Sequence, residues 1–419
     1  MLKAEILCVG TELLLGDIVN TNAAFLARQL AQAGVAVYHQ AVVGDNDSRL
    51  REALSQALEQ NDLVVLTGGL GPTYDDMTKE TVADYFGLPM EENKEALEQI
   101  KAFFARIDRP MTDNNKKQAL VPKGAQVLQN HHGTAPGVWV ERDGKAAILL
   151  PGPPREMQPM FLESVLPRLQ SRTGQVILSH TLHLFGMGES QAEQLLRPLM
   201  LASQNPTLAP YAKDGEVQLR VTARASNAQE AEQLMAPLLE QVPKLLGPEK
   251  IYGLDVGTLQ NALVQALTKA SRTIAVAESC TGGLLAKRIT EIPGASQVFG
   301  FGAVTYSCEA KERMLGVSGE TLSGVGAVSA EAARERAAGV RALSGADIGL
   351  SVTGNAGPAS SEGKPVGLVY IGVASPAGVR HLELHLDRGR PDDREMIRVL
   401  SSSHALYQAL QELRMLSFA

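Results

Sequence analysis

The stretch AESCTGGLLAK, residues 277–287, holds three adjacent side chains whose types could do chemistry. Ser279, Cys280 and Thr281 stand between an apolar run and two glycines that open a helical pattern. In an alternating α/β chain such a turn lies at the carboxyl edge of the sheet, where ligands bind. The first N–H groups of the helix, expected from Thr281 to Gly283, would favour an anion or a developing oxyanion. The stretch is therefore a candidate nucleophile turn.

Other interpretations of this turn remain open. The G-x-S-x-G pattern of a nucleophile elbow is absent. Ser279 or Thr281 could serve only as the N-cap of the helix. Cys280 is the rival nucleophile, and a thiol is intrinsically the better one at neutral pH. Residue spacing alone does not decide among the three.

A serine nucleophile needs a base within hydrogen-bond reach. No Ser-His-Asp set is evident among the eight histidines. The candidate base is Lys311 in AVTYSCEAK, where the chain again crosses from strand to helix. A desolvated lysine loses its proton near neutral pH, and the phenol of Tyr306 could orient or relay that proton. The segment EAKER also fits an ordinary charged helix face, so both interpretations stand.

Two further turns could hold a phosphate-bearing ligand beside Ser279. The segment DIGLSVTGNAGP ends a strand with Thr353, Gly354 and Gly357, whose backbone groups suit a phosphate. The segment DDREMIR places Arg394 at a helix start, and its guanidinium suits bidentate phosphate contact. The alternatives are a simple glycine turn and a solvated surface arginine.

A glycine loop near the N-terminus is a stronger candidate for a phosphate site than the turns near Ser279, because it has three glycines. In VVLTGGLGPTYDDMTKE, Gly68, Gly69 and Gly71 follow a strand and let backbone N–H groups approach a phosphate, although no Walker motif is present. Asp75 and Asp76 are hard oxygen ligands, placed where a divalent cation could bridge to that phosphate. Capping of the next helix is the alternative role for these two carboxylates.

Three polar loops could close this first site. They are GTELLLGD after the first strand, NNKKQA with Asn115 and Lys117, and LPGPPREM with Glu156. These three residues are candidates for contact with the ligand.

The elements that must position these residues alternate along most of the chain. Strand-length apolar runs and helical patterns follow each other through residues 1–172 and again through 254–419, which is typical of βαβ units and of sheets with helices on both faces. The last three strands are expected to be partly antiparallel because little separates them. Residues 173–253 have a βαββα order and predict a small α+β module. The predicted fold is therefore two α/β domains joined by that module.

Composition limits the class of protein. Of the 419 residues, 44% are hydrophobic and 20% charged, which is typical of soluble globular chains, and the formal charge is −7. Residues 173–252 hold six Lys and Arg and eight Asp and Glu. This slightly acidic balance does not favour binding to nucleic acid. No signal peptide or membrane span is evident, so we expect a cytoplasmic protein. The three scattered cysteines are expected to be reduced thiols.

Taken together, these motifs resemble the family of the competence- and damage-inducible protein CinA over essentially the whole chain. GTELLLGDIVNTN, TGGLGPTYDDMTKE and LPGPPREM resemble its N-terminal domain, which has the molybdopterin-binding fold and is associated with ADP-ribose pyrophosphatase activity. AESCTGG, TYSCEAK, GAVSAE and KPVG resemble its C-terminal domain, associated with nicotinamide mononucleotide amidohydrolase activity. NPTLAPYAKDGEVQLRVTA resembles its KH-like linking module.

This resemblance implies roles for individual residues. It makes Ser279 the nucleophile that accepts the acyl group, Lys311 its base and Tyr306 an assisting group. It implies a divalent cation, Mg, Mn or Co, at Asp75 and Asp76, and no cofactor for the C-terminal domain. The implied substrate-binding residues are Thr281, Gly282, Gly283, Thr353, Gly354, Gly357, Arg394, Gly68, Gly69, Gly71, Thr73, Thr78, Lys79, Asn115, Lys117 and Glu156.

The resemblance also implies partners, and it has two departures. The implied partners are small nucleotides and a second copy of the chain in a homodimer, without a membrane or direct nucleic-acid contact. The family commonly has Asn where Cys308 stands, and TGIAGPxGG where this chain has TGNAGPASS. Two rival functions remain open: a non-catalytic nucleotide-sensing adaptor in DNA uptake or repair, and a first domain that binds molybdopterin or another nucleotide.

Overall fold

The computed structural model describes residues 2–213, 215–389 and 393–418. By internal contacts the chain divides into two compact units, residues 1–179 with 222–236 and residues 180–221 with 237–419. The dividing lines pass through the middle module, so the domain boundaries expected at 172 and 253 stay a prediction.

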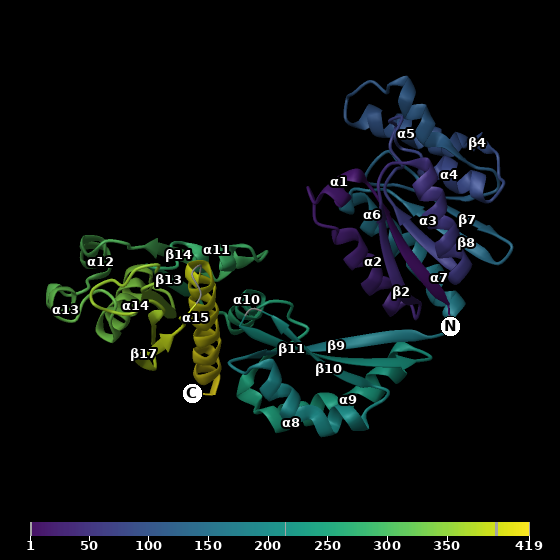
Figure 1. The fold of residues 1–419 in the computed structure, drawn as a ribbon. Coiled ribbons are helices and arrows are strands. Elements are labelled where there is room, and N and C mark those ends of the chain that lie inside the picture. Colours follow the sequence, from purple (N-terminus) through teal and green to yellow (C-terminus); the bar gives the residue numbers. More distant parts are fainter. Residues whose placement is uncertain (1, 214, 390–392, 419) are drawn as a thin grey trace. The chain divides into compact units, whose positions relative to one another are not determined.

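The first α/β domain is built on a six-stranded sheet (Figure 1). Its order is β2-β1-β3-β8-β7-β6, and the first four of these strands are parallel. The sequence pattern missed the antiparallel strands β7 and β6. Asp143 and Gly144, both left-handed, form the tight turn that reverses β7 into β8. The strands are β1 (Lys3–Val9), β2 (Ala36–Val43), β3 (Leu63–Thr67), β6 (Gln126–Leu128), β7 (Gly137–Arg142) and β8 (Lys145–Leu150).

Helices cover both faces of this sheet, as the alternation predicted. Ile6 and Cys8 of β1 belong to the core under α2, α6 and α7, whereas Leu7 and Val9 belong to the core under α3 and α4. The remaining elements of the domain are α1 (Thr11–Leu15), α2 (Thr21–Gln32), α3 (Asp47–Gln60), α4 (Thr78–Tyr85), β4 (Met90–Glu92), α5 (Lys94–Arg106), η1 (Asp113–Ala119), β5 (Leu120–Pro122), α6 (Pro154–Met160), η2 (Phe161–Val165) and α7 (Leu166–Thr173).

The middle module has the predicted βαββα order, and a fourth strand completes its sheet. The strand order is β10-β11-β9-β12, and β12 pairs antiparallel with β9. The elements are β9 (Val176–Phe185), α8 (Glu189–Ala202), β10 (Thr207–Lys213), β11 (Glu216–Ala225), α9 (Ala228–Leu246), η3 (Pro248–Lys250) and β12 (Ile251–Leu254).

The last domain has a five-stranded sheet of order β14-β13-β15-β16-β17. β14, β13 and β15 are parallel, and β15, β16 and β17 are antiparallel, which confirms the expectation for the last three strands. The strands are β13 (Ile274–Glu278), β14 (Phe299–Val304), β15 (Ile348–Gly354), β16 (Leu368–Ser375) and β17 (Gly378–His385).

Helices again pack on both faces of this sheet (Figure 1). The large core joins the strands to α10, α11 and α15, and the smaller core lies under α12 and α14. The helices are α10 (Leu259–Ala270), α11 (Leu284–Thr290), η4 (Ala295–Gln297), α12 (Cys308–Leu315), α13 (Gly319–Gly324), α14 (Ala330–Ser344) and α15 (Asp393–Phe418).

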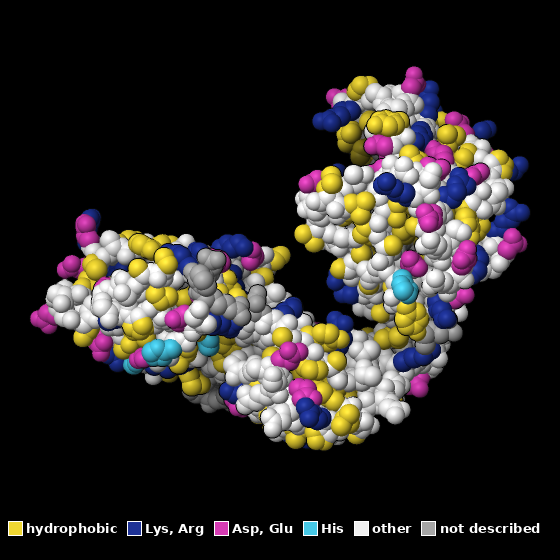
Figure 2. Space-filling model, in the orientation of Figure 1, with side chains coloured by type: hydrophobic (Ala, Val, Ile, Leu, Met, Phe, Trp, Pro, Cys, Tyr) yellow, Lys and Arg dark blue, Asp and Glu magenta, His cyan; other side chains and the backbone are white. Residues whose placement is uncertain are grey.

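Charges of both signs mix on the face of the molecule that Figure 2 shows. On that face, basic and acidic side chains are interspersed over the elements rather than gathered by sign. None of the helices in the described part of the chain combines the length and the apolar character that crossing a bilayer would require.

We predict that the close contact between α14 and the sheet depends on glycines. A Cβ atom at Gly349 would lie 2.2 Å from the Ala337 carbonyl oxygen of α14. Gly349→Ala should therefore lower the free energy of unfolding by about 1–3 kcal/mol, measured by urea denaturation of the whole chain. Gly300→Ala is the control, since a Cβ there meets no atom within 4 Å. Equal stability of the two variants would contradict the tight packing.

Candidate functional site

Strand register places Ser279 between two neighbouring strand ends. The last residue of β13, Glu278, pairs with Val304 of β14 and with Val352 of β15. β14 and β15 lie on opposite sides of β13, so the strand order reverses here. Open α/β sheets bind ligands at such a reversal, outside the carboxyl ends of the strands. The sheet thus brings the predicted turns after β13, β14 and β15 to one edge.

The helix after Ser279 begins later than the sequence predicted. Gly282 and Gly283 have positive φ angles of 57° and 96°, and α11 starts only at Leu284. The buried carboxylate of Glu278 lies at the start of this helix. It accepts hydrogen bonds of 2.8–3.0 Å from the N–H groups of Gly283, Leu285 and Ala286. The Gly282 N–H donates to the Ser279 carbonyl. The expectation that both glycine N–H groups are free for an oxyanion is therefore wrong.

The helix-cap interpretation of this turn is also wrong. The N-cap position is Gly283, and no side chain caps the helix there. The Thr281 hydroxyl is buried without a hydrogen-bond partner among the described residues. The half-buried Ser279 hydroxyl has none either within that part of the chain. The partly buried Ser279 hydroxyl therefore remains open to a ligand, whereas the Thr281 hydroxyl is wholly enclosed.

The rival nucleophile, Cys280, points into the core. Its side chain is 7% exposed and packs in the cluster under α10, α11 and α15. Burial raises the pKa of this thiol to about 11. At neutral pH Cys280 is a protonated core residue, which favours Ser279 as the reactive group of the turn.

Lys311 is a buried amine at the same sheet edge. Only 2% of it is exposed, and its Nζ donates to the Tyr306 carbonyl at 2.8 Å. Burial, and then the positive charge of Arg336, lower the pKa of Lys311. The phenol of Tyr306 is 64% exposed, so Tyr306 meets Lys311 through its backbone and not through the predicted side chain. Among the described residues, Lys311 and Ser279 share no hydrogen bond.

The other predicted residues of this edge hold its loops in place. The Thr353 hydroxyl donates to the Ala327 carbonyl at 2.7 Å. A Cβ at Gly354 would lie 2.6 Å from the Val369 side chain, so only glycine fits there. Arg394, at the start of α15 as predicted, donates one guanidinium N–H to the Gly357 carbonyl. That contact takes part of the guanidinium that was expected to bind phosphate.

A cavity of about 390 Å³ lies at the equivalent edge of the first domain. It opens where β1 and β3 end side by side, again at a reversal of strand order. The predicted residues Gly68, Gly69, Gly71, Asp75, Asp76 and Glu156 line it. Glu12 and Asp45 also line it; sequence reasoning missed them as site residues, although GTELLLGD pointed to the loop that carries Glu12.

The glycines of the first loop are required by close approach. A Cβ at Gly68 would lie 2.0 Å from the Val9 carbonyl oxygen, and one at Gly69 would lie 2.2 Å from the Thr78 hydroxyl. That hydroxyl donates to the Gly68 carbonyl at 3.0 Å. In the described part of the chain the N–H groups of Gly69 and Gly71 have no acceptor, so they can donate to a ligand.

The two aspartates behave differently. Asp76 accepts hydrogen bonds from the N–H of Thr73, at 2.9 Å, and from its hydroxyl, and so closes the loop. Asp75 Oδ1 is buried and has no hydrogen-bond partner among the described residues. The neighbouring Thr73 hydroxyl above all holds the pKa of Asp75 below its ordinary value, so this carboxylate is ionised at neutral pH. The helix-capping alternative is wrong, because α4 begins at Thr78 with Met77 as an uncapped N-cap.

The predicted lysines hold backbone carbonyls and do not line the cavity. Lys117 donates to the carbonyls of Thr73, at 3.1 Å, and Asp76. Lys79 is buried and donates to the Gln118 carbonyl at 2.7 Å, and burial lowers its pKa to about 8. Asn115 forms a capping box with Thr112 at the start of η1 and does not line the cavity.

The acidic lining of this cavity fits a divalent cation shared with a ligand. An ionised, unpartnered Asp75 oxygen needs a positive partner. No group of three or more His, Cys, Asp or Glu side chains in the described residues could hold a metal ion alone. Asp75 and Asp76 would therefore hold a cation together with phosphate oxygens and water.

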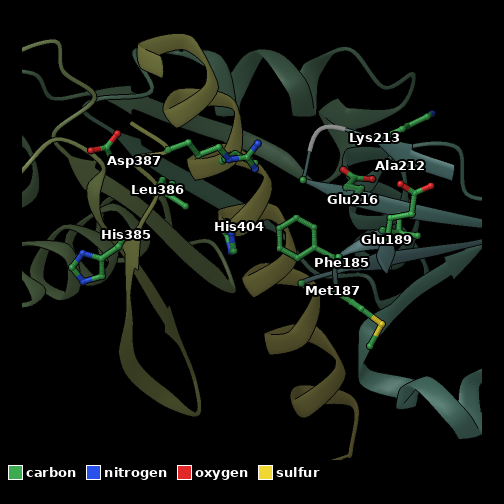
Figure 3. Close-up of a pocket in the computed structure, with 16 residues that line it drawn as sticks. Phe185, Met187, Glu189, Ala212, Lys213, Glu216, His385, Leu386, Asp387 and His404 are labelled. Atoms are coloured by element: carbon green, nitrogen blue, oxygen red, sulfur yellow. The ribbon is translucent and has the colours of Figure 1, made fainter. Parts of the chain in front are cut away.

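Figure 3 draws a second cavity, of about 450 Å³, between the middle module and the C-terminal domain within one compact unit. Phe185, Lys213, Glu216, His385 and His404 are among its lining residues. Burial lowers the pKa of His404 to about 4, so its imidazole is neutral at pH 7. The predicted site residues do not line this cavity.

Comparison with known proteins assigns each part of the chain. Residues 5–171 match the model described as "probable molybdopterin binding domain", residues 179–253 the damage-inducible protein CinA KH domain, and residues 256–413 the CinA C-terminal domain. A competence-damage inducible protein of Caldanaerobacter subterraneus subsp. tengcongensis is 48% identical over 96% of this chain and 97% of its own length. That of Clostridium novyi is 48% identical over 99% and 98%. A crystal structure of CinA from Thermoplasma acidophilum is 38% identical and covers 38% of this chain and 94% of that one, with a TM-score of 0.36.

The fold and the two strand-edge sites define a class: an α/β protein with a molybdopterin-binding-like domain, a KH module and a CinA-type domain in that order. The sequence is 48% identical to full-length relatives over nearly the whole chain, so the assignment extends from the class of protein to a particular family. The chain belongs to the CinA family.

We predict that the three thiols differ sharply in reactivity. Cys308 is exposed, whereas burial raises the pKa of both Cys8 and Cys280. Because the thiolate is the reactive form, Ellman's reagent at pH 8 should label one thiol quickly in the native chain and all three after unfolding. Cys308→Ser should remove the fast reaction. A fast thiol that persists in this variant would place Cys280 or Cys8 at the surface.

Proposed function

We propose that this chain is a hydrolase of pyridine nucleotides with two separate sites. The C-terminal domain converts nicotinamide mononucleotide to nicotinic acid mononucleotide and ammonia, and the first domain cleaves the pyrophosphate of ADP-ribose. The single observation that carries the first activity is the buried Lys311 amine, with its lowered pKa, at the same sheet edge as the unpartnered Ser279 hydroxyl. The choice of substrates rests on the resemblance of AESCTGG, TYSCEAK and TGGLGPTYDDMTKE to the family's motifs.

In this proposal the amide is hydrolysed in two steps. The neutral Lys311 amine removes the proton of the Ser279 hydroxyl as its oxygen attacks the carboxamide carbon. The carbon–nitrogen bond then breaks, and the proton held on Lys311 passes to the nitrogen, which leaves as ammonia. The same amine then removes a proton from water as the water oxygen attacks the ester carbon. The bond between that carbon and the Ser279 oxygen breaks, Lys311 returns its proton to the Ser279 oxygen, and the acid product leaves and ionises to the carboxylate.

The first domain acts through its loop and its acidic lining. The N–H groups of Gly69 and Gly71, which have no acceptor among the described residues, bind phosphate oxygens, and Asp75 and Asp76 would hold a divalent cation. The cation, when bound, polarises a phosphoryl oxygen. Glu12, Asp45 and Glu156 line the same cavity and are the carboxylates that can orient water for attack on the pyrophosphate.

We predict that Ser279 and Lys311 act as a unit. Ser279→Ala and Lys311→Ala should each lower kcat for ammonia release from nicotinamide mononucleotide by about 10³-fold or more, and the double variant little further. Because the pKa of Lys311 is lowered and the neutral amine is the active form, kcat/KM should rise with pH through that pKa.

Two control variants make this result specific. Lys287→Ala removes an exposed lysine of α11 that pairs with Glu291, and it should leave kcat unchanged. Cys280→Ala should remain active, because its thiol lies in the core. An active Ser279→Ala beside an inactive Lys311→Ala would assign the nucleophile to another hydroxyl. Absence of ammonia from the unaltered protein would favour the non-catalytic adaptor.

We predict that the first domain needs a cation at Asp75. Asp75→Asn removes the charge of a carboxylate whose Oδ1 has no hydrogen-bond partner among the described residues, so the fold should be unaffected. Release of AMP from ADP-ribose should fall by about 100-fold or more. EDTA should abolish the same activity and spare ammonia release. Asp113→Ala, which alters an exposed surface carboxylate, is the control. Loss of both activities on chelation would refute separate sites.

The remaining expectations follow the same proposal. We propose that the protein works in the cytoplasm as a homodimer, that its substrates are small nucleotides, and that it binds neither a membrane nor nucleic acid directly. Sedimentation of the purified chain measures the oligomeric state directly.

A further inference from the structure

Arg336 of α14 is wholly buried beneath the Ser279 edge. Its Nη1 donates to the Val352 carbonyl at 2.6 Å, and its Nη2 donates to the Thr305 hydroxyl at 3.3 Å. Val352 is the β15 partner of Glu278, and the Thr305 N–H donates to the Glu278 carbonyl at 3.0 Å. One guanidinium thus joins the two strand ends that flank the residue before Ser279.

Among the described residues no carboxylate is in contact with this guanidinium, although the buried carboxylate of Glu278 lies near enough to favour its charge. Arg336 forms no ion pair among the described residues, and its Nε is buried without a hydrogen-bond partner. Burial lowers the pKa of Arg336 to about 10, so it stays charged at neutral pH. A buried charge of this kind is costly, and an apolar side chain of similar size would fill the space at less cost. Packing alone therefore does not account for arginine here.

The neighbour on which this charge acts is Lys311. Burial is the first cause that lowers the pKa of Lys311, and the charge of Arg336 is the second. The carboxylate of Glu362 acts in the opposite sense and favours the charged lysine, and the sulfur atoms of Cys308 and Cys280 would do so only as thiolates. The Lys311 Nζ also donates a hydrogen bond to the Tyr306 carbonyl. Arg336 is the one cation among these groups.

We propose that Arg336 is a positioning residue of the Ser279 site: its buried guanidinium aligns the ends of β14 and β15 and sets a fixed positive charge beside the Lys311 amine. It touches neither substrate nor the reacting atoms, and it acts through Lys311 and the strand ends. This role rests on the proposed amide hydrolysis, because the neutral amine is the active base there.

The test compares the pH dependence of kcat/KM for ammonia release in three variants. Arg336→Gln removes the charge, so the pKa of Lys311 should rise and the acidic limb of the profile should move up by about one pH unit. Activity on that limb should fall about tenfold at a given pH. Arg336→Lys keeps the charge but loses the pair of hydrogen bonds to Val352 and Thr305. The acidic limb of its pH profile should therefore keep its position, and kcat should fall. Arg334→Gln, on the same helix but partly exposed and paired with Glu331, should match the unaltered protein.

A titration without substrate separates this proposal from the proposed function. The ¹³C shift of the Lys311 ε-carbon, assigned by comparison with Lys311→Arg, should titrate at higher pH in Arg336→Gln than in the unaltered chain. If no variant releases ammonia, the proposed function fails, while this titration still supports or overturns the role of Arg336. An unmoved titration in Arg336→Gln overturns it. If Arg336→Gln does not fold, Arg336→Lys decides: kcat equal to that of the unaltered protein overturns the alignment of the strands.

Discussion

The buried carboxylate of Glu278 organises the C-terminal site. A carboxylate inside a protein must be compensated, and here three backbone N–H groups at the start of α11 do so. That arrangement is possible only because Gly282 and Gly283 adopt left-handed conformations and carry the chain back over the strand end. The turn is closed from the other side by Arg398 of α15, which donates to the carbonyls of Cys280 and Thr281. Ser279 is therefore presented by a turn that hydrogen bonds to its backbone and to the Glu278 carboxylate hold in place.

The two α/β domains use the same geometric device for different chemistry. In each domain, one parallel strand lies between the next two parallel strands of the sheet: β1 lies between β2 and β3, and β13 between β14 and β15. The loops after these strands run to opposite sides and leave an open edge. In the first domain this edge is lined by carboxylates and free glycine N–H groups, which suits a cation and phosphates. In the last domain it carries hydroxyls and a buried amine, which suits acyl transfer. The composition of the loops, rather than the fold, separates the two proposed activities.

Much of this architecture can be predicted from the sequence, because long apolar runs and helical periods agree with each other along the chain. The placement of Ser279, Thr353 and the first glycine loop at strand ends follows from that alternation. The helix start at Leu284 does not, since the sequence does not show that Glu278 turns its side chain toward the helix. Nor does the role of Lys117, whose carbonyl partners are brought close only by the fold. The capping box of Asn115 with Thr112 is local in sequence, and the interpretation of Asn115 as a ligand contact overlooked it. The tight turn between β7 and β8 does have a sequence signal, because Asp-Gly favours a two-residue hairpin, but alternation of strands and helices does not predict an antiparallel pair there.

The register of β13 has a consequence for the order in which the chain acquires its structure. Thr273 and Asp347, 74 positions apart, are joined by a hydrogen bond of 2.8 Å where β13 and β15 begin to pair. The β16–β17 hairpin, by contrast, pairs Ser375 with Gly378 and closes almost without a loop. Contacts between distant segments carry the larger loop-closure cost and form later than local ones. The hairpin can therefore form early during refolding, whereas the edge that presents Ser279 appears only when the most distant pairing in the sheet is complete.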